Sequence, residues 1–170
     1  MRVRLLERRK RQWRTIVCVS PLRNPEPFDP QAIRRYSVIH VYYEYPWQRG
    51  EEKYFIVLRQ AREAKGDCCW CIKATSRVPR YEADKRLLNS VVLYERNTIP
   101  FFTERTVIDP ASFIQMWHSH LKNEADRGRY RIAGRMPEDF HAKLVAAIKQ
   151  PFLLEPKTAK QILRCIGEEQ

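Results

Sequence analysis

The stretch Tyr36–Tyr45, with the sequence YSVIHVYYEY, carries the strongest strand signal in this chain of 170 residues. It is rich in β-branched and aromatic residues, which suit the pleated and half-buried surface of a sheet. The segment Pro46–Gly50 interrupts it, and Lys53–Leu58 (KYFIVL) then repeats the same composition. These two stretches predict neighbouring strands joined by a short connection.

Three further segments carry the same signal, namely Cys68–Thr75 (CCWCIKAT), Ser90–Tyr94 (SVVLY) and the shorter Thr106–Ile108. Residues 61–67 and 78–88 are predicted to be charged connections between them. Strands broken by turns at this spacing are typical of a β-sandwich or a small barrel.

The C-terminal part of the chain changes to a helical period. Within Pro137–Gln150 the apolar residues recur at intervals of four and three positions, which predicts a helix packed through one face. These apolar residues are Phe140, Leu144, Ala147 and Ile148. A second helix is predicted over Thr158–Ile166, with Gly167 as its stop. The fold class is therefore predicted to be mainly β with C-terminal helices (α+β).

Three other segments give weaker signals. Residues 15–19 (TIVCV) suit a short strand, and Asp29-Pro30 favours the start of a short helix that reaches Arg35. Residues 110–121 are ambiguous, although their apolar positions would suit one helix face.

The charge of the chain is strongly basic and unevenly distributed. Lys and Arg number 32 against 20 Asp and Glu, a net charge of +12, and residues 1–35 alone hold ten basic and three acidic side chains. A basic balance favours a polyanionic partner such as nucleic acid, and the alternative is a solvated basic face. We expect a basic N-terminal extension (1–35), a barrel domain (36–150) and a helical extension (151–170). Residues 1–14 suit an arm that contacts phosphate, or alternatively a transit peptide.

Membrane and secretory signals are missing from the sequence. No window holds eighteen uncharged apolar residues, and the charged start MRVRLLERRKRQWR has no apolar signal core. We therefore expect a cytoplasmic protein with no membrane contact, whose five Cys are free thiols in a reducing compartment.

Two groups of residues invite a metal interpretation, and both lack a complete ligand set. Zinc prefers four ligands, usually as two short pairs, but Cys68, Cys69 and Cys71 have no second pair. On a strand, Cys69 and Cys71 would share one face, with Cys68 on the other. His118 and His120 could share a metal on a strand but would diverge on a helix. No metal site and no cofactor are predicted.

Phosphate-cradling loops are also absent, since the chain has only five Gly and no Walker or dinucleotide motif. The remaining chemistry would use cations and hydroxyls at the ends of predicted strands. If those strands are neighbours, such groups could neutralise a phosphodiester and hold its oxygens. The alternative is ordinary polarity at strand ends. The residues concerned are Lys53, Lys73, Thr75, Ser76, Arg77, Arg105 and Thr106.

The order of four short motifs resembles the PemK/MazF-like toxin family. These motifs are GEEKYFIVL (50–58), IKATS (72–76), RTVIDP (105–110) and GRMPE (134–138), and the resemblance covers residues 36–150. Lys53 falls where the family has Arg, and Lys lacks the bidentate fork of Arg.

The resemblance implies a small SH3-like β-barrel with edge helices, usually a homodimer. It implies metal-independent cleavage of single-stranded RNA by the toxin of a toxin–antitoxin module, inhibited by an antitoxin protein. Carried over by position, Lys53, Thr75 and Ser76 are the expected catalytic residues. Nucleic-acid binding is assigned to Arg49, Lys73, Arg77 and Arg105.

Two other hypotheses fit the same residues. The chain could be an SH3-like barrel that binds nucleic acid or protein without cleaving it. It could also be an accessory protein of a phage or mobile element, whose basic arm docks to another chain.

The ligand spacing generates a first prediction, that the purified protein carries no stoichiometric zinc, because its Cys and His lack paired spacing. Elemental analysis of the purified chain measures this directly. A value of about one zinc per chain would contradict it.

Overall fold

A computed structural model describes residues 26–45, 48–150 and 154–168. The predicted arm at 1–14 and the predicted strand at 15–19 lie outside the described residues. Among the described residues, no helix is long and apolar enough to cross a membrane.

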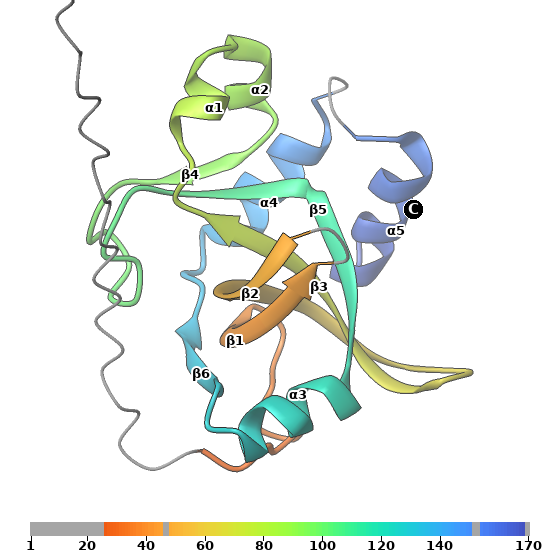
Figure 1. The fold of residues 1–170 in the computed structure, drawn as a ribbon. Coiled ribbons are helices and arrows are strands. Elements are labelled where there is room, and N and C mark those ends of the chain that lie inside the picture. Colours follow the sequence, from red (N-terminus) through yellow and green to blue (C-terminus); the bar gives the residue numbers. More distant parts are fainter. Residues whose placement is uncertain (1–25, 46–47, 151–153, 169–170) are drawn as a thin grey trace, which may run out of the picture.

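Six antiparallel strands form one curled sheet, a half-barrel that is plain in Figure 1. The order across the sheet is β4-β5-β3-β2-β1-β6. The strands are β1 (Ser37–Tyr45), β2 (Gln48–Glu63), β3 (Gly66–Thr75), β4 (Val92–Tyr94), β5 (Thr106–Trp117) and β6 (Tyr130–Arg135). The predicted fold class, mainly β with C-terminal helices, is confirmed.

Five helices accompany the sheet. They are α1 (Pro79–Glu82), α2 (Lys85–Asn89), α3 (His118–Asp126), α4 (Phe140–Ile148) and α5 (Pro156–Ile166). Helices α4 and α5 lie on one side of the sheet, and α3 lies at its other end (Figure 1). Three apolar clusters result among the described residues, one between the sheet and α4–α5, one between the sheet and α3, and a smaller one between β5 and α1.

Strand β3 shows why the sheet is covered on both sides. Its side chains alternate, so that Cys69 and Cys71 enter the cluster beside α3 while Ile72 and Ala74 enter the cluster beside α4 and α5. All four residues are almost fully buried. The predicted sharing of one face by Cys69 and Cys71 is therefore confirmed.

Both predicted C-terminal helices are confirmed. Phe140, Leu144 and Ile148 of α4 are buried at the predicted spacing. Helix α5 ends at Gly167, whose φ of 79° is the left-handed conformation that glycine adopts readily. Ile162 of α5 is fully buried in the same cluster as α4, so the C-terminal segment shares a core with the barrel.

Two connections predicted to be loops are structured. The charged connection at 61–67 belongs largely to a hairpin, because β2 runs on to Glu63 and β3 begins at Gly66. The connection at 78–88 forms the short helices α1 and α2, because Pro79 occupies the first turn of α1 and the Asp84 side chain accepts a hydrogen bond from Arg86 N in α2.

The late strand is much longer than predicted, and residues 110–117 are strand rather than helix. Residues 106–117 form β5 because they pair with β3 on both sides of a bulge. The bulge lies between the pairs Ile72–Phe113 and Ala74–Ile108, where the sheet tolerates Pro110. Strand β6 was not predicted.

The prediction of a short helix that reaches Arg35 is wrong. Residues 30–33 form a turn closed by a hydrogen bond from Ile33 N to Pro30 O at 3.3 Å. The turn delivers the Ile33 side chain into the cluster beside α3, where it is buried. The chain then enters β1 only four residues later, which leaves no room for a further helical turn.

The packing of α4 generates a second prediction. Leu144→Ala should lower the free energy of unfolding by about 2–5 kcal/mol, because it leaves a cavity at a fully buried position. Chemical denaturation followed by circular dichroism measures the change. Ala142→Ser on the exposed side of the same helix is the control and should stay within about 0.5 kcal/mol. Equal effects of the two substitutions would contradict the packing of α4.

Candidate functional site

A hollow at the end of β3 brings together the three residues expected to be catalytic, although Lys53 lies inside β2, which begins at Gln48, and does not open that strand as predicted. Lys53, Thr75 and Ser76 all line this strand-end hollow, whose volume is about 220 Å³. It is formed by residues 52–54 of β2, residues 74–76 at the end of β3, and residues 101–104 and 106. The register that pairs Phe55 with Lys73, continued by two residues, sets Lys53 level with Thr75.

The hollow straddles two faces of the sheet. Because side chains alternate along a strand, Lys53 shares a face with Lys73 and Thr75, whereas Tyr54 and Ala74 belong to the opposite face. The first face supplies cations and a hydroxyl. The second supplies apolar and aromatic surface, so a ligand across the strand ends would meet both kinds of group.

Lys53 is the cation that lines the hollow, and Lys73 lies outside the lining on the same face of the sheet. The Lys53 ammonium is 3.2 Å from Glu51 Oε2, and its side chain is 20% exposed. The Lys73 ammonium lies 4.9 Å from the centre of the Tyr45 ring, in cation–π contact. The Lys73 amide donates a hydrogen bond to Ser112 Oγ in the bulge of β5. The bulge therefore holds the backbone of Lys73 in place.

Partial burial and charge repulsion shift the pKa values of Lys73 and Tyr45. Burial lowers the pKa of Lys73, and the neighbouring charge of Lys53 lowers it further. Burial, followed by the charge of Glu51, raises the pKa of Tyr45 to about 12, so Tyr45 is a neutral phenol. An anion placed between Lys53 and Lys73 would relieve their repulsion.

Thr75 and the residues after it provide hydroxyls and a further cation. Thr75 Oγ1 accepts a hydrogen bond from Arg77 N at 3.2 Å, which leaves its own O–H able to donate to a ligand. Ser76 and Arg77 are exposed at the end of β3. The charge of Arg77 acts to lower the pKa of both Tyr45 and Lys73, and Arg77 lies outside the lining of the hollow.

Arg105 is directed toward two carboxylates. Its guanidinium is 2.7 Å from Glu82 Oε1 and 2.9 Å from Glu95 Oε2. It therefore ties α1 to the segment before β5, and it does not line the hollow. Arg49 is exposed near the start of β2 and also lies outside the lining.

The outer wall of the hollow was not predicted from the sequence. Phe101, Phe102, Thr103 and Glu104 belong to a connection without regular structure, and only the adjacent pair of Phe signalled an apolar role. Phe101 lies against Gly134 of β6, where a Cβ atom would come within 2.8 Å of its ring. The missing side chain at Gly134 therefore makes room for this wall.

The fold brings one residue from each of the two groups considered for metal binding into contact, but it does not complete a ligand set among the described residues. His118 and His120 lie on α3 and diverge, since His118 Nε2 is 3.5 Å from Cys69 Sγ and His120 Nε2 is 3.1 Å from the Tyr42 carbonyl oxygen. Across the described part of the chain, no three His, Cys, Asp or Glu side chains gather into a metal-binding group.

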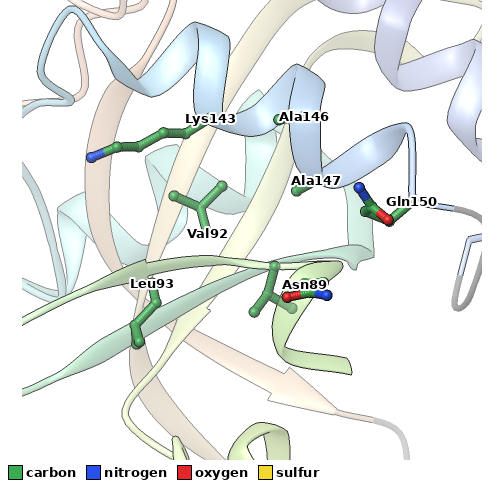
Figure 2. Close-up of a pocket in the computed structure, with 8 residues that line it drawn as sticks. Asn89, Val92, Leu93, Lys143, Ala146, Ala147 and Gln150 are labelled. Carbon is green, nitrogen blue, oxygen red and sulfur yellow. The ribbon is translucent and has the colours of Figure 1, made fainter. Parts of the chain in front are cut away.

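A second hollow, of about 370 Å³, lies between β4 and α4 (Figure 2). Its eight described lining residues include no carboxylate, imidazole, hydroxyl or thiol. Lys143 points away from Ala147 and Gln150 in Figure 2, and its ammonium is 2.6 Å from Asp139 Oδ2. Lys143 is the one charged side chain among the described residues that line this hollow.

Comparison of the chain with protein-family models, with characterised proteins and with solved structures finds no match. The assignment of the strand-end hollow as the candidate site therefore depends on its geometry and on its residues.

The different surroundings of two cations generate a third prediction. Lys73→Ala should weaken binding of a labelled single-stranded oligonucleotide about tenfold, the scale of one charge-assisted hydrogen bond. Arg105→Ala should change it little, because Glu82 and Glu95 already neutralise that guanidinium. Fluorescence anisotropy at one fixed salt concentration measures both. A larger loss of affinity for Arg105→Ala than for Lys73→Ala would indicate that the oligonucleotide binds near α1 instead.

Proposed function

We propose that this protein binds single-stranded RNA across the strand-end hollow and cleaves it without a metal ion. The observation that carries the proposal is the presence of Lys53, Thr75 and Ser76 around one hollow. The resemblance of the sequence motifs to the PemK/MazF-like toxin family supports the same residues. The net charge of +12 favours a polyanionic substrate.

In this proposal the cationic face binds the phosphate of the scissile bond. The ribose 2′-oxygen attacks phosphorus, the bond to the 5′-oxygen breaks, and the products are a 2′,3′-cyclic phosphate and a free 5′-hydroxyl. Lys53 stabilises the negative charge that develops on the phosphoryl oxygens, and a Thr75 or Ser76 hydroxyl donates to one of them. Lys73 and Arg77 neutralise the flanking backbone.

The aromatic side of the hollow suits the bases of an unpaired strand. Tyr54 and Phe101 line it, and aromatic rings bind unstacked bases with little dependence on sequence. A duplex would keep its bases stacked inside, so this surface favours a single strand.

The same resemblance implies the toxin of a toxin–antitoxin module, with a small acidic antitoxin as its partner and a homodimer as its assembly. An antitoxin that covers the strand-end hollow would block the substrate. Its acidic side chains would complement the basic charge of this chain.

One observation favours a second function, that of a barrel that binds nucleic acid or protein without cleaving it. Lys53 is already paired with Glu51, and Arg105 with Glu82 and Glu95. A cation that is already paired with a carboxylate stabilises the negative charge on a phosphate less than an unpaired one does, so binding without chemistry would follow if these pairs persist in the complex.

A fourth prediction separates the two functions. Incubation of the protein with single-stranded RNA in EDTA should yield fragments with cyclic phosphate ends, measured by gel electrophoresis and mass spectrometry. Lys53→Ala should lower the cleavage rate about a hundredfold or more, the scale of one lost transition-state donor. Lys149→Ala, at an exposed position just after α4, is the matched control and should leave the rate unchanged.

Binding without cleavage would support the second function. Equal behaviour of Lys53→Ala and Lys149→Ala in an active protein would show that the site lies elsewhere.

A further inference from the structure

The wall that β2 contributes to the strand-end hollow carries a second group of ionisable side chains. Glu52 and Tyr54 line the hollow, and His40 of β1 lies opposite Tyr54 in the sheet register. The same His40 lies opposite Arg131 of β6. A row of three polar side chains therefore crosses three strands and ends at the hollow.

The contacts within this group place His40 behind Glu52. His40 Nε2 is 3.7 Å from Glu52 Oε2, and the imidazole is 18% exposed against 46% for the glutamate. The imidazole packs on the Tyr54 ring with 4.4 Å between ring centres. The carboxylate lines the hollow and is the more exposed of the two groups, so a ligand in the hollow can reach it.

The surroundings of His40 keep its ring neutral near neutral pH. Burial lowers its pKa below the ordinary value of 6.5, the charge of Glu52 opposes this effect, and the charge of Arg131 adds to it. Tyr54 from β2 also faces the ring, and the Tyr54 hydroxyl is 3.5 Å from Arg131 Nη2. A neutral imidazole can donate one N–H toward the carboxylate.

Cleavage by a ribose hydroxyl needs a proton acceptor, which the residues expected to be catalytic do not supply. Lys53 is a cation, and the hydroxyls of Thr75 and Ser76 are very weak bases. Among the residues that line the hollow, the carboxylates are Glu52 and Glu104. Of the two, Glu52 is the one with a histidine beside it.

Building on the proposed function, we infer that Glu52 accepts the proton of the ribose 2′-hydroxyl and that His40 positions the Glu52 carboxylate. In this step the bond from the 2′-oxygen to phosphorus forms and the bond from phosphorus to the 5′-oxygen breaks. The 2′-hydroxyl proton passes to a Glu52 oxygen, and the departing 5′-oxygen takes a proton from water. Glu52 then returns its proton to solvent, so no co-reactant other than water is consumed.

The direct test is Glu52→Gln, which keeps the size of the side chain and removes the base. The rate of RNA cleavage should fall about a hundredfold or more, the scale of general base catalysis. Binding of the same oligonucleotide should persist, because no cation is removed. Glu63→Gln, exposed at the far end of the same strand, is the matched control and should retain the wild-type rate.

The role of His40 is tested by the pH dependence of the rate. In the wild type the rate should fall as pH drops through the lowered pKa of His40, because an imidazolium beside Glu52 makes the carboxylate a weaker base. His40→Gln, which carries no charge at any pH, should lose this limb of the profile. His120→Gln on α3 is the control and should keep it.

The outcomes distinguish this inference from the proposed function. A wild-type protein that does not cleave RNA would overturn both. A wild-type protein that cleaves, together with Glu52→Gln at the wild-type rate, would overturn the inference and leave the proposed function intact. A His40→Gln profile identical to the wild type would remove the positioning role of His40. Circular dichroism of each variant excludes loss of folding as the cause.

Discussion

The antiparallel pairing of β2 with β3 is the interaction on which the rest of the structure depends. These strands lie at the centre of the sheet, and both of their faces are covered by apolar clusters. The pair Phe55–Lys73 sets the register that brings Lys53 level with Thr75. A slip of one residue would exchange the two faces of a strand, which would turn charged Lys73 toward the apolar cluster beside α4 and α5. The hydrophobic burial of the strands therefore also fixes the position of the site.

The site occupies the point where burial of the sheet gives way to solvent. Lys73 lies one residue after the fully buried Ile72, with Tyr45 packed against its ammonium and Lys53 nearby. In such a half-desolvated position a charge interacts more strongly with a ligand than it would in water. Glu51 partly compensates the cations, so the arrangement remains stable without a ligand. The partial burial of Lys73 and the nearby charge of Lys53, which lower the pKa of Lys73, therefore favour the binding of a phosphate.

The segment between β4 and β5 completes the hollow and is held there by two different means. Phe102 is buried in the apolar cluster beside α4 and α5, and its backbone N–H donates to the carbonyl oxygen of Ile99. Arg105 at the end of the segment bridges Glu82 of α1 and Glu95. A residue that the sequence motif suggested for nucleic-acid binding thus has a structural role in this arrangement, because α1 presents a carboxylate to it.

The sequence by itself determined the strand and helix types, as shown by the alternation in β3 and the four-residue spacing in α4, because local periodicity reports which side chains must be buried. It also singled out Lys53, Thr75 and Ser76, which line one hollow, although Lys53 lies inside β2 and not at the strand end where the sequence placed it. Only the tertiary structure decided the length of β5, the existence of β6 and the outer wall of the hollow. These features depend on pairing partners that are distant in the chain. The contact between His40 and Glu52 depends on such pairing as well, because it forms only through the register of β1 with β2. Long-range pairing leaves no local period, and so no signal along the chain could reveal it.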